Sequence, residues 1–234
     1  MKSRNIDIFI SGAGPAGLLA SISFASLGYS VICVDPHKPV THANDAGADL
    51  RTTAFLQPAK HFMQSLDLWA ELKSYAVPME IMRIIDAAGE YWPPREKTTK
   101  DFLSSDISDL PFGWNIPNWL LRRAFTEKAN KYSNLELKFG LTTSSFIRRD
   151  DAAFVYLDDG SQIKAKLVIG ADGRNSFIRE KSQIKISRTE FSQKALTFIV
   201  SHAKPHQNTS IEIHQSGGPF TFVPLANFEG KACS

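Results

Sequence analysis

The first forty residues show the clearest pattern of hydrophobic and polar positions. An apolar run at residues 6–11 is typical of a central parallel strand buried on both faces. After a glycine-rich turn, residues 18–27 carry apolar side chains at helical spacing, between Pro15, which suits a helix start, and Gly28, which suits a helix end. A second apolar run at residues 30–34 completes a strand, helix, strand unit.

The rest of the chain alternates between helical and strand patterns. Helical spacing predicts helices over residues 55–69 and 118–130, the second one entered at Pro117. Residues 80–92 predict a hairpin around 87–90, whereas residues 96–110 lack a pattern and are expected to form a loop. Further strands are predicted at residues 135–139, 146–148, 153–157, 162–169, 190–201, 210–214 and 220–225. The later strands indicate an antiparallel sheet distinct from the first unit, so the predicted class is α/β.

Composition narrows the class of protein further. The 234 residues are 43% hydrophobic and 22% charged, which is typical of soluble globular domains and excludes collagen, coiled coil and disorder. The net charge of +3 is not gathered into one basic block, which argues against a nucleic-acid partner. The two cysteines, Cys33 and Cys233, indicate a reducing compartment, and no apolar run is long enough to span a membrane. We therefore expect a cytoplasmic protein.

The turn after the first strand has the composition of a dinucleotide site. It reads Gly12-Ala13-Gly14-Pro15-Ala16-Gly17, and Asp35 follows the second strand 18 residues after the last glycine. Gly12 permits the tight turn, Gly14 lets a pyrophosphate approach the backbone, and Gly17 lets the helix pack closely on the strand. Asp35 would accept hydrogen bonds from a ribose hydroxyl. The motif and its context predict nucleotide binding, without distinguishing FAD from NAD.

A second candidate site follows the strand at residues 162–169. Asp172 stands between two glycines, Gly170 and Gly173, which suggests a second close approach of backbone to ligand, with an ordinary turn as the alternative. Arg51, after a polar loop, could reach the pyrophosphate or could be a solvent-facing charge at a helix start.

Other candidate residues point to ordinary structural roles. His202, His206 and His214 lie close in sequence, but Pro205 interrupts their spacing and no cysteine or carboxylate cluster completes a metal site, so none is predicted. Cys33 is expected to be a buried small residue. The tryptophans are expected in the core, although Trp92 could alternatively line a ring-binding pocket.

Taken together, these motifs resemble the flavin-dependent aromatic hydroxylases with the p-hydroxybenzoate hydroxylase fold, and among them the ubiquinone-biosynthesis hydroxylases. The resemblance covers essentially the whole chain in order. It rests on the glycine motif, Asp49-Leu50-Arg51, Ile116-Pro117-Asn118, residues 168–179 and the run from Gly218 to Leu225.

The resemblance implies a Rossmann-like FAD-binding domain and a partial antiparallel-sheet substrate domain. It assigns residues 1–78 and 113–183 to FAD binding and residues 79–112 and 184–234 to the substrate domain. It further implies that the glycine motif and Asp35 bind the ADP half of FAD, that Arg51 meets the ribose or pyrophosphate, that Asn118 is a polar flavin contact, and that Asp172 and Gly173 serve both FAD and transient NAD(P)H.

The implied reaction is hydroxylation of an electron-rich ring. NAD(P)H reduces FAD, the reduced flavin takes up O2, and one oxygen atom reaches a phenol, here a prenylated phenol of ubiquinone biosynthesis. The flavin is the reagent, so no side chain is named as catalytic. Such a substrate implies peripheral contact with the inner membrane and a place in a ubiquinone-biosynthesis complex.

One departure from the family concerns a third motif, of the form Gly-Asp-Ala-Ala-His, which this sequence does not contain. We therefore expect a fragment of a longer enzyme. A flavin-dependent reductase on the same scaffold and a non-catalytic dinucleotide-binding remnant are the alternatives.

Overall fold

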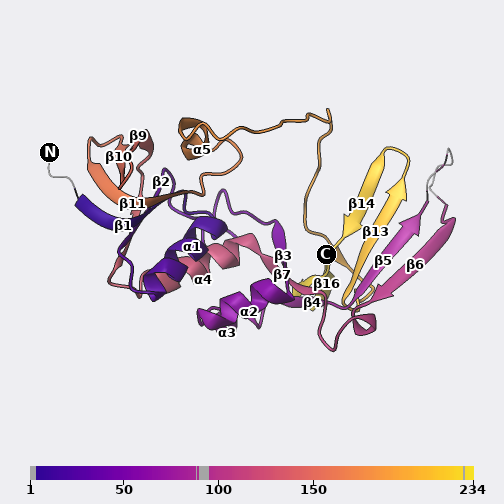
Figure 1. Ribbon diagram of the computed structural model, residues 1–234. Helices are drawn as coiled ribbons and strands as arrows, with labels where there is room; N and C mark the ends of the chain where they lie inside the picture. Colours follow the sequence, from indigo (N-terminus) through magenta and orange to yellow (C-terminus); the bar gives the residue numbers. More distant parts are fainter. Residues whose placement is uncertain (1–3, 88, 90–94, 229) are drawn as a thin grey trace. The chain divides into compact units, whose positions relative to one another are not determined.

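The computed structural model divides into two compact units, each assembled from two separate stretches of chain. It describes residues 4–87, 89, 95–228 and 230–234. Unit 1 comprises Met1–Asp49 and Trp119–Ala195, and unit 2 comprises Leu50–Asn118 and Leu196–Ser234. Figure 1 traces the chain through both units in sequence colours.

The unit boundaries differ from the predicted domain boundaries. Residues 50–78 and 113–118 belong to unit 2 and residues 184–195 to unit 1, whereas the prediction assigned them the other way round. Compactness reflects contacts within the chain rather than contacts with a ligand. The assignment of each segment to FAD or to substrate therefore stays a prediction.

Unit 1 is built on a six-stranded sheet in the order β8-β2-β1-β11-β10-β9. Its strands are β1 (Arg4–Ser11), β2 (Val31–Asp35), β8 (Leu135–Phe139), β9 (Thr143–Arg148), β10 (Ala153–Leu157) and β11 (Gln162–Gly170). The first four in spatial order run parallel, and β10 and β9 extend the sheet antiparallel. The helices are α1 (Pro15–Ser26), α4 (Asn118–Ala129) and α5 (Phe177–Lys181).

Strands β1 and β2, the inner pair of the four parallel strands, contribute fully buried residues to the core of unit 1. Phe9 and Ile10 of β1 are fully buried although successive side chains point to opposite faces, so β1 is covered on both sides, as predicted. Ile32 and Cys33 of β2 are buried in the same way. This burial holds the carboxyl ends of both strands in place, where the glycine turn and Asp35 follow.

Unit 2 contains three smaller sheets. The first is β14-β13-β5-β6, the second β3-β7-β4, and the third β12-β16-β15. The strands are β3 (Thr52–Leu56), β4 (Val77–Met79), β5 (Ile81–Asp86), β6 (Thr98–Leu103), β7 (Gly113–Pro117), β12 (Ser201–His202), β13 (Thr209–Gln215), β14 (Gly218–Phe222), β15 (Leu225–Phe228) and β16 (Lys231–Cys233). The helices are α2 (Gln57–Ser65), α3 (Trp69–Leu72) and the 3-10 turn η1 (Ser104–Asp106).

The structure confirms the α/β class and the elements with strong periodicity. The helix at Asn118 begins where Pro117 predicts, and it buries the apolar positions of its predicted inner face. Gly28 has a φ of +88° directly after α1, and Gly160 has a φ of +81° in the turn between β10 and β11. Both positions use the left-handed backbone that glycine permits.

Four local predictions are wrong. Residues 98–103 form strand β6 rather than loop, and residues 52–56 form strand β3 rather than the start of a helix. Of the strand predicted at residues 190–201, residues 190–200 have no regular structure and only residue 201 belongs to a strand, and the run from 220 to 225 is divided between β14 and β15. In β6 and β3, backbone pairing with β5 and β7 decides the conformation, because their side chains are mostly exposed and carry no hydrophobic alternation.

The sheet of unit 2 is also not wholly antiparallel. The pairs β5–β6 and β13–β14 are antiparallel, but β13 and β5 pair in parallel, with Thr209 opposite Ile81. A parallel pair needs a long connection, and 122 residues of chain separate the two strands, counted from Asp86 to Thr209. Asp86 of β5 lies opposite Thr98 of β6, whereas the hairpin predicted over residues 80–92 around 87–90 includes residues 88 and 90–92, which lie outside the described part of the chain.

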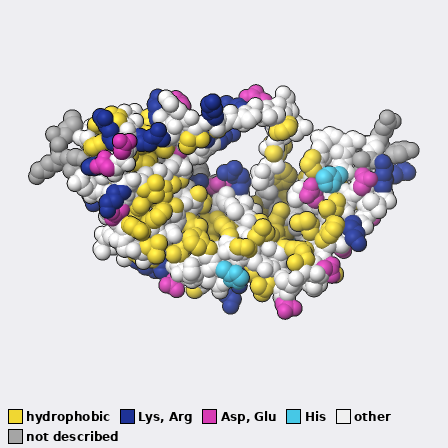
Figure 2. Space-filling view, in the orientation of Figure 1, with side chains coloured by type: hydrophobic (Ala, Val, Ile, Leu, Met, Phe, Trp, Pro, Cys, Tyr) yellow, Lys and Arg dark blue, Asp and Glu magenta, His cyan; other side chains and the backbone are white. Residues whose placement is uncertain are grey.

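On the face shown in Figure 2, Lys and Arg side chains are interspersed with Asp and Glu side chains. This distribution agrees with the small net charge. In the part of the chain that the structure describes, no helix is both long enough and apolar enough to cross a membrane.

Candidate functional site

The first glycine of the turn is required by both its backbone angle and its surroundings. Gly12 has a φ of +102°, and a Cβ there would overlap the carbonyl oxygen of Ala171 and stand 2.8 Å from the backbone nitrogen of Asp172. The Ala171 N–H also donates to the Ser11 carbonyl at 2.7 Å. The turn after β1 and the loop after β11 are therefore packed backbone to backbone.

The third glycine has a different role from the predicted one. A Cβ on Gly17 would overlap the carbonyl oxygen of Gly12 and lie 3.2 Å from the Ala171 side chain. Gly17 therefore lets the first turn of α1 pack on the glycine turn itself and on the loop after β11. The prediction that a side chain is excluded at this position holds, but its neighbour is the turn rather than the strand.

The middle glycine, Gly14, has free space where a side chain would lie. No described atom lies within 4 Å of the position that a Cβ on Gly14 would take. Gly14 is the N-cap residue of α1 and Pro15 follows it in the first turn, where Ala16 is exposed. Among the described residues no side chain caps this end of the helix. Unpaired N–H groups and the helix dipole favour a negative group there.

A cavity of about 500 Å³ lies beside this helix end within unit 1. Gly12 and Gly14 line it from the turn after β1, Asp35 from the end of β2, and Asp172 and Gly173 from the loop after β11. These segments all follow the carboxyl ends of parallel strands, where open α/β sheets bind ligands. The structure thus brings together the two motifs that the sequence predicts separately.

Asp35 supports the glycine turn. Its Oδ2 accepts a hydrogen bond from the Ala13 N–H at 2.7 Å, and its Oδ1 accepts one from the His37 N–H at 2.8 Å. A carboxylate has about four acceptor positions, so each oxygen keeps capacity toward the cavity that it lines. The side chain can therefore accept a ribose hydroxyl while it holds the turn.

Asp172 organises the second loop. One carboxylate oxygen accepts a hydrogen bond from the Ser176 hydroxyl and the other accepts one from the Ile178 N–H at 3.1 Å. Ser176 caps α5 by accepting a hydrogen bond from the Arg179 N–H at 3.1 Å. Gly173 has a φ of +82°, a left-handed backbone conformation that glycine permits. This network fixes the loop that lies against Gly12.

The remaining predicted residues, Arg51 and Asn118, lie together in unit 2. The Asn118 N–H donates to the Arg51 carbonyl at 2.9 Å, and the Thr53 hydroxyl donates to Asn118 Oδ1 at 2.7 Å. The structure thus places these two residues beside each other. Their contact with a cofactor stays a prediction.

Several cavity residues were missed by the sequence reasoning. Leu141, Thr142 and Thr143 line the cavity from the segment after β8, and His37 and Phe177 line it as well. The signal for the first three was the strand at residues 135–139, because the carboxyl ends of parallel strands meet at one edge of a sheet. For His37 and Phe177 the chain pattern held no comparable signal.

Two polar features lie within the same sheet. The Lys166 ammonium, 2.7 Å from Asp7 Oδ1, and the Ser30 hydroxyl and N–H lower the pKa of the Asp7 carboxyl far below its usual range. Burial raises the pKa of Cys33 to about 12, so its thiol is neutral at pH 7. Cys33 is fully buried, as predicted for a small core residue.

The histidines have structural partners. Nδ1 of His206 accepts a hydrogen bond from the Asn208 N–H, and its Nε2 lies 3.1 Å from the Leu225 carbonyl oxygen. His202 contacts the Lys204 carbonyl and the Ser234 hydroxyl. Within the described ranges, no group of three or more His, Cys, Asp or Glu side chains could hold a metal ion.

Comparisons with known proteins identify relatives of this architecture. Ubiquinone hydroxylase UbiL of Rhodospirillum rubrum is 26% identical over 219 residues, which make up 94% of this chain and 49% of that protein. The 3-demethoxyubiquinol 3-hydroxylase of Escherichia coli K12 is 24% identical over 225 residues, which make up 96% of this chain and 56% of that protein. The chain thus spans about half the length of the curated relatives it matches.

Solved structures share the fold. PqsL of P. aeruginosa, in complex with 2-aminobenzoylacetate, matches 98% of this chain and 60% of its own, with a TM-score of 0.78 and 20% identity. The p-nitrophenol 4-monooxygenase PnpA of Pseudomonas putida matches 76% of this chain and 44% of its own, with a TM-score of 0.63 and 19% identity.

The family model described as FAD binding domain matches residues 5–232. This range contains the glycine turn, Asp35 and the Asp172 loop, all of which line one cavity. The resemblance to flavin-dependent hydroxylases, including those of ubiquinone biosynthesis, is confirmed by the family and the relatives. The chain therefore belongs to the FAD binding domain family.

Proposed function

We propose that the protein is an FAD-dependent monooxygenase that uses NAD(P)H and O2 to hydroxylate an aromatic ring, and that its substrate is a prenylated phenol of ubiquinone biosynthesis. The printed names of the relatives, a ubiquinone hydroxylase and a 3-demethoxyubiquinol 3-hydroxylase, support the substrate class. The observation that carries the proposal is the open position at Gly14, at an uncapped helix end beside a cavity of about 500 Å³.

The residues of unit 1 fit the ADP half of FAD. The backbone at Gly12, Gly14, Pro15, Ala16 and Gly17 would hold the pyrophosphate, because no side chain keeps a phosphate from the N–H groups there. Asp35 would accept the ribose hydroxyls. Asp172 and Gly173 would close the cavity from the other loop, with Arg51 and Asn118 as the contacts assigned by family resemblance.

When bound, the flavin would supply the reaction with oxygen and the transfer of one oxygen atom to the ring. The protein's part is to bind, orient and exclude water, so no residue is assigned as acid or base. A prenylated substrate would bring the protein to a membrane surface and into contact with other enzymes of the same biosynthesis.

The experiment uses the protein that contains this chain, purified from its native source. We expect flavin absorbance bands, oxygen uptake with NADPH or NADH that rises when a prenylated phenol is added, and a product heavier by one oxygen atom. NADPH oxidation without oxygen incorporation would contradict the proposal and favour a flavin-dependent reductase. A preparation that neither contains nor binds FAD would contradict it in favour of a non-catalytic dinucleotide-binding remnant.

A further inference from the structure

Unit 2 contains a second cavity, of about 630 Å³, that no part of the proposed FAD site uses. It lies against one face of the sheet β14-β13-β5-β6, where Phe222, Ile211 and Arg83 line it. The other wall comes from residues 198–207, including Phe198. Most of this lining is apolar, which is typical of a site for an uncharged organic ligand.

The register of the sheet places one charged pair in this apolar face. Phe222 is opposite Ile211, Ile211 is opposite Arg83, and Arg83 is opposite Asp101, so the four residues form one row across the four strands. Residues opposite each other in neighbouring strands share a face. An arginine in such a row needs a partner, because an unpaired charge on an apolar surface is costly.

Asp101 is that partner. Nε of Arg83 donates to Asp101 Oδ1 and Nη2 donates to Oδ2, both at 2.7 Å, which is the bidentate geometry of a strong charge-assisted pair. The hydrogen bonds from Arg83 lower the pKa of the Asp101 carboxyl, so it is ionised at neutral pH and cancels the guanidinium charge.

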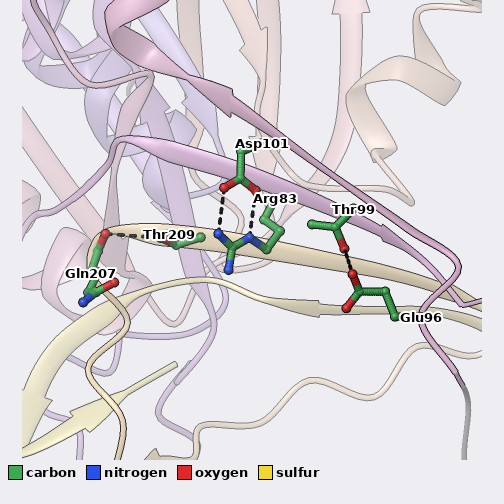
Figure 3. Close-up of polar contacts among 6 residues, drawn as sticks. All are labelled: Arg83, Glu96, Thr99, Asp101, Gln207 and Thr209. Carbon is green, nitrogen blue, oxygen red and sulfur yellow. Dashed lines mark hydrogen bonds and ion pairs between the residues drawn. The ribbon is translucent and has the colours of Figure 1, made fainter.

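One guanidinium nitrogen is left over. Figure 3 shows the third nitrogen of Arg83, Nη1, pointing away from Asp101, and among the described residues it has no hydrogen-bond partner. Arg83 lines the cavity, whereas Asp101 is absent from its described lining. The lining of the cavity therefore includes a side chain that keeps one hydrogen-bond donor unused while its charge is balanced by Asp101.

We propose that Arg83 and Asp101 form a specificity-determining pair: Arg83 Nη1 donates a hydrogen bond to an oxygen substituent of an uncharged aromatic ring in this cavity, and Asp101 disfavours carboxylated rings. The inference rests on the proposed function for the aromatic class of ligand. A carboxylate would have to share the guanidinium with Asp101 and lose its hydration beside Phe220 and Phe222, whereas a hydroxyl or carbonyl oxygen needs only the free donor.

A matched pair of probes tests the charge preference. Methyl 4-hydroxybenzoate and 4-hydroxybenzoate differ in size by one methyl group and in charge by one unit at pH 7. Calorimetric titration of the purified chain should give an affinity about tenfold higher for the ester, the scale of one charge-assisted hydrogen bond. Asp101→Asn should raise the affinity for the acid about tenfold and leave the ester within about twofold.

A control variant locates the effect. Glu212→Gln removes a carboxylate from β13 on the opposite face of the same sheet, since Glu212 is adjacent in sequence to Ile211, and it should leave both affinities unchanged.

Equal affinities of the wild-type chain for ester and acid, or no binding of the ester, would overturn the proposal without any variant. An unchanged affinity ratio in a folded Asp101→Asn variant, judged by circular dichroism, would overturn it as well. FAD binding is titrated in parallel by flavin absorbance. Loss of FAD binding with an intact ester preference contradicts only the proposed function, whereas normal FAD binding without the preference contradicts only the pair.

Discussion

The two cavities of this protein are built from different materials. The unit 1 cavity presents backbone and glycine at the ends of parallel strands, with Gly14 open at the end of α1. The unit 2 cavity presents side chains, with Phe222 and Arg83 in one row across its sheet. A site built from backbone groups accepts few substitutions, because added side chains would block the backbone. A site built from side chains can bind a different ligand when those side chains are substituted. This difference is expected where one cavity holds a cofactor and the other selects a ligand.

The largest effect is expected from a substitution in the glycine turn beside the unit 1 cavity. Gly17→Ala places a methyl group into the Gly12 carbonyl, and we expect a loss of about 3 kcal/mol in the free energy of unfolding, since neither backbone segment can move aside. Urea denaturation measures this loss. The matched control is Gly14→Ala, whose added methyl meets no described atom within 4 Å.

Gly14→Ala should change the free energy of unfolding by less than about 1 kcal/mol, because the lower entropy of the unfolded chain and the poorer N-cap residue oppose each other, and yet it should weaken FAD binding in a flavin titration. Equal destabilisation by the two alanines would mean that Gly14 has a structural role and is not kept free for a ligand.

The second effect concerns the loop after β11. Asp172→Asn weakens the hydrogen bonds with Ser176 and Ile178, and we expect a loss of about 1.5 kcal/mol because both involve an ionised acceptor. Hydrogen exchange should rise at the amides of residues 176–179 before it rises in the core. Unchanged exchange at these amides would show that the carboxylate does not hold the loop.

The third effect tests whether the two cavities act independently. Phe222 contacts Phe220 edge to face, with ring centroids 4.7 Å apart. Phe222→Leu should weaken binding of methyl 4-hydroxybenzoate about fivefold, the scale of one aromatic contact, and leave FAD affinity unchanged. A parallel loss of FAD affinity would indicate that the cavities are coupled.

The smallest effect is a dependence on pH. The lowered pKa of Asp7 means that its ion pair with Lys166 stabilises the fold fully above about pH 4, the unfolded value, and that this contribution is lost as pH falls through the folded value. Asp7→Asn should therefore be less stable than the wild type at pH 7, and the difference measured by urea denaturation should shrink steadily as the pH falls below about 4. A constant difference across this range would assign the effect to packing instead of charge.

The elements that could be predicted share one property. Strand β1, helix α1 and helix α4 are long, periodic and largely buried. Their pattern of hydrophobic residues therefore predicts both the type of element and its buried positions. Strand β6 was missed because its mostly polar, exposed side chains carry no such pattern, and only backbone pairing with β5 makes it a strand. The residues of a strand do not by themselves indicate that it pairs with a strand elsewhere in the chain.

The two cavities differ in the same way in how far the sequence alone predicts them. Residue types alone predict the glycine turn, the acidic residue at the end of β2 and the Asp-Gly loop after β11, because each position needs a backbone freedom or a side chain that few other residues provide. Three contacts become visible only in the folded chain: Gly17 packs on Gly12, Thr142 lines the cavity of unit 1, and Arg83 pairs with Asp101. Those contacts arise from strand order and register, which bring distant residues together through hydrogen bonds that the backbone of any sequence can form.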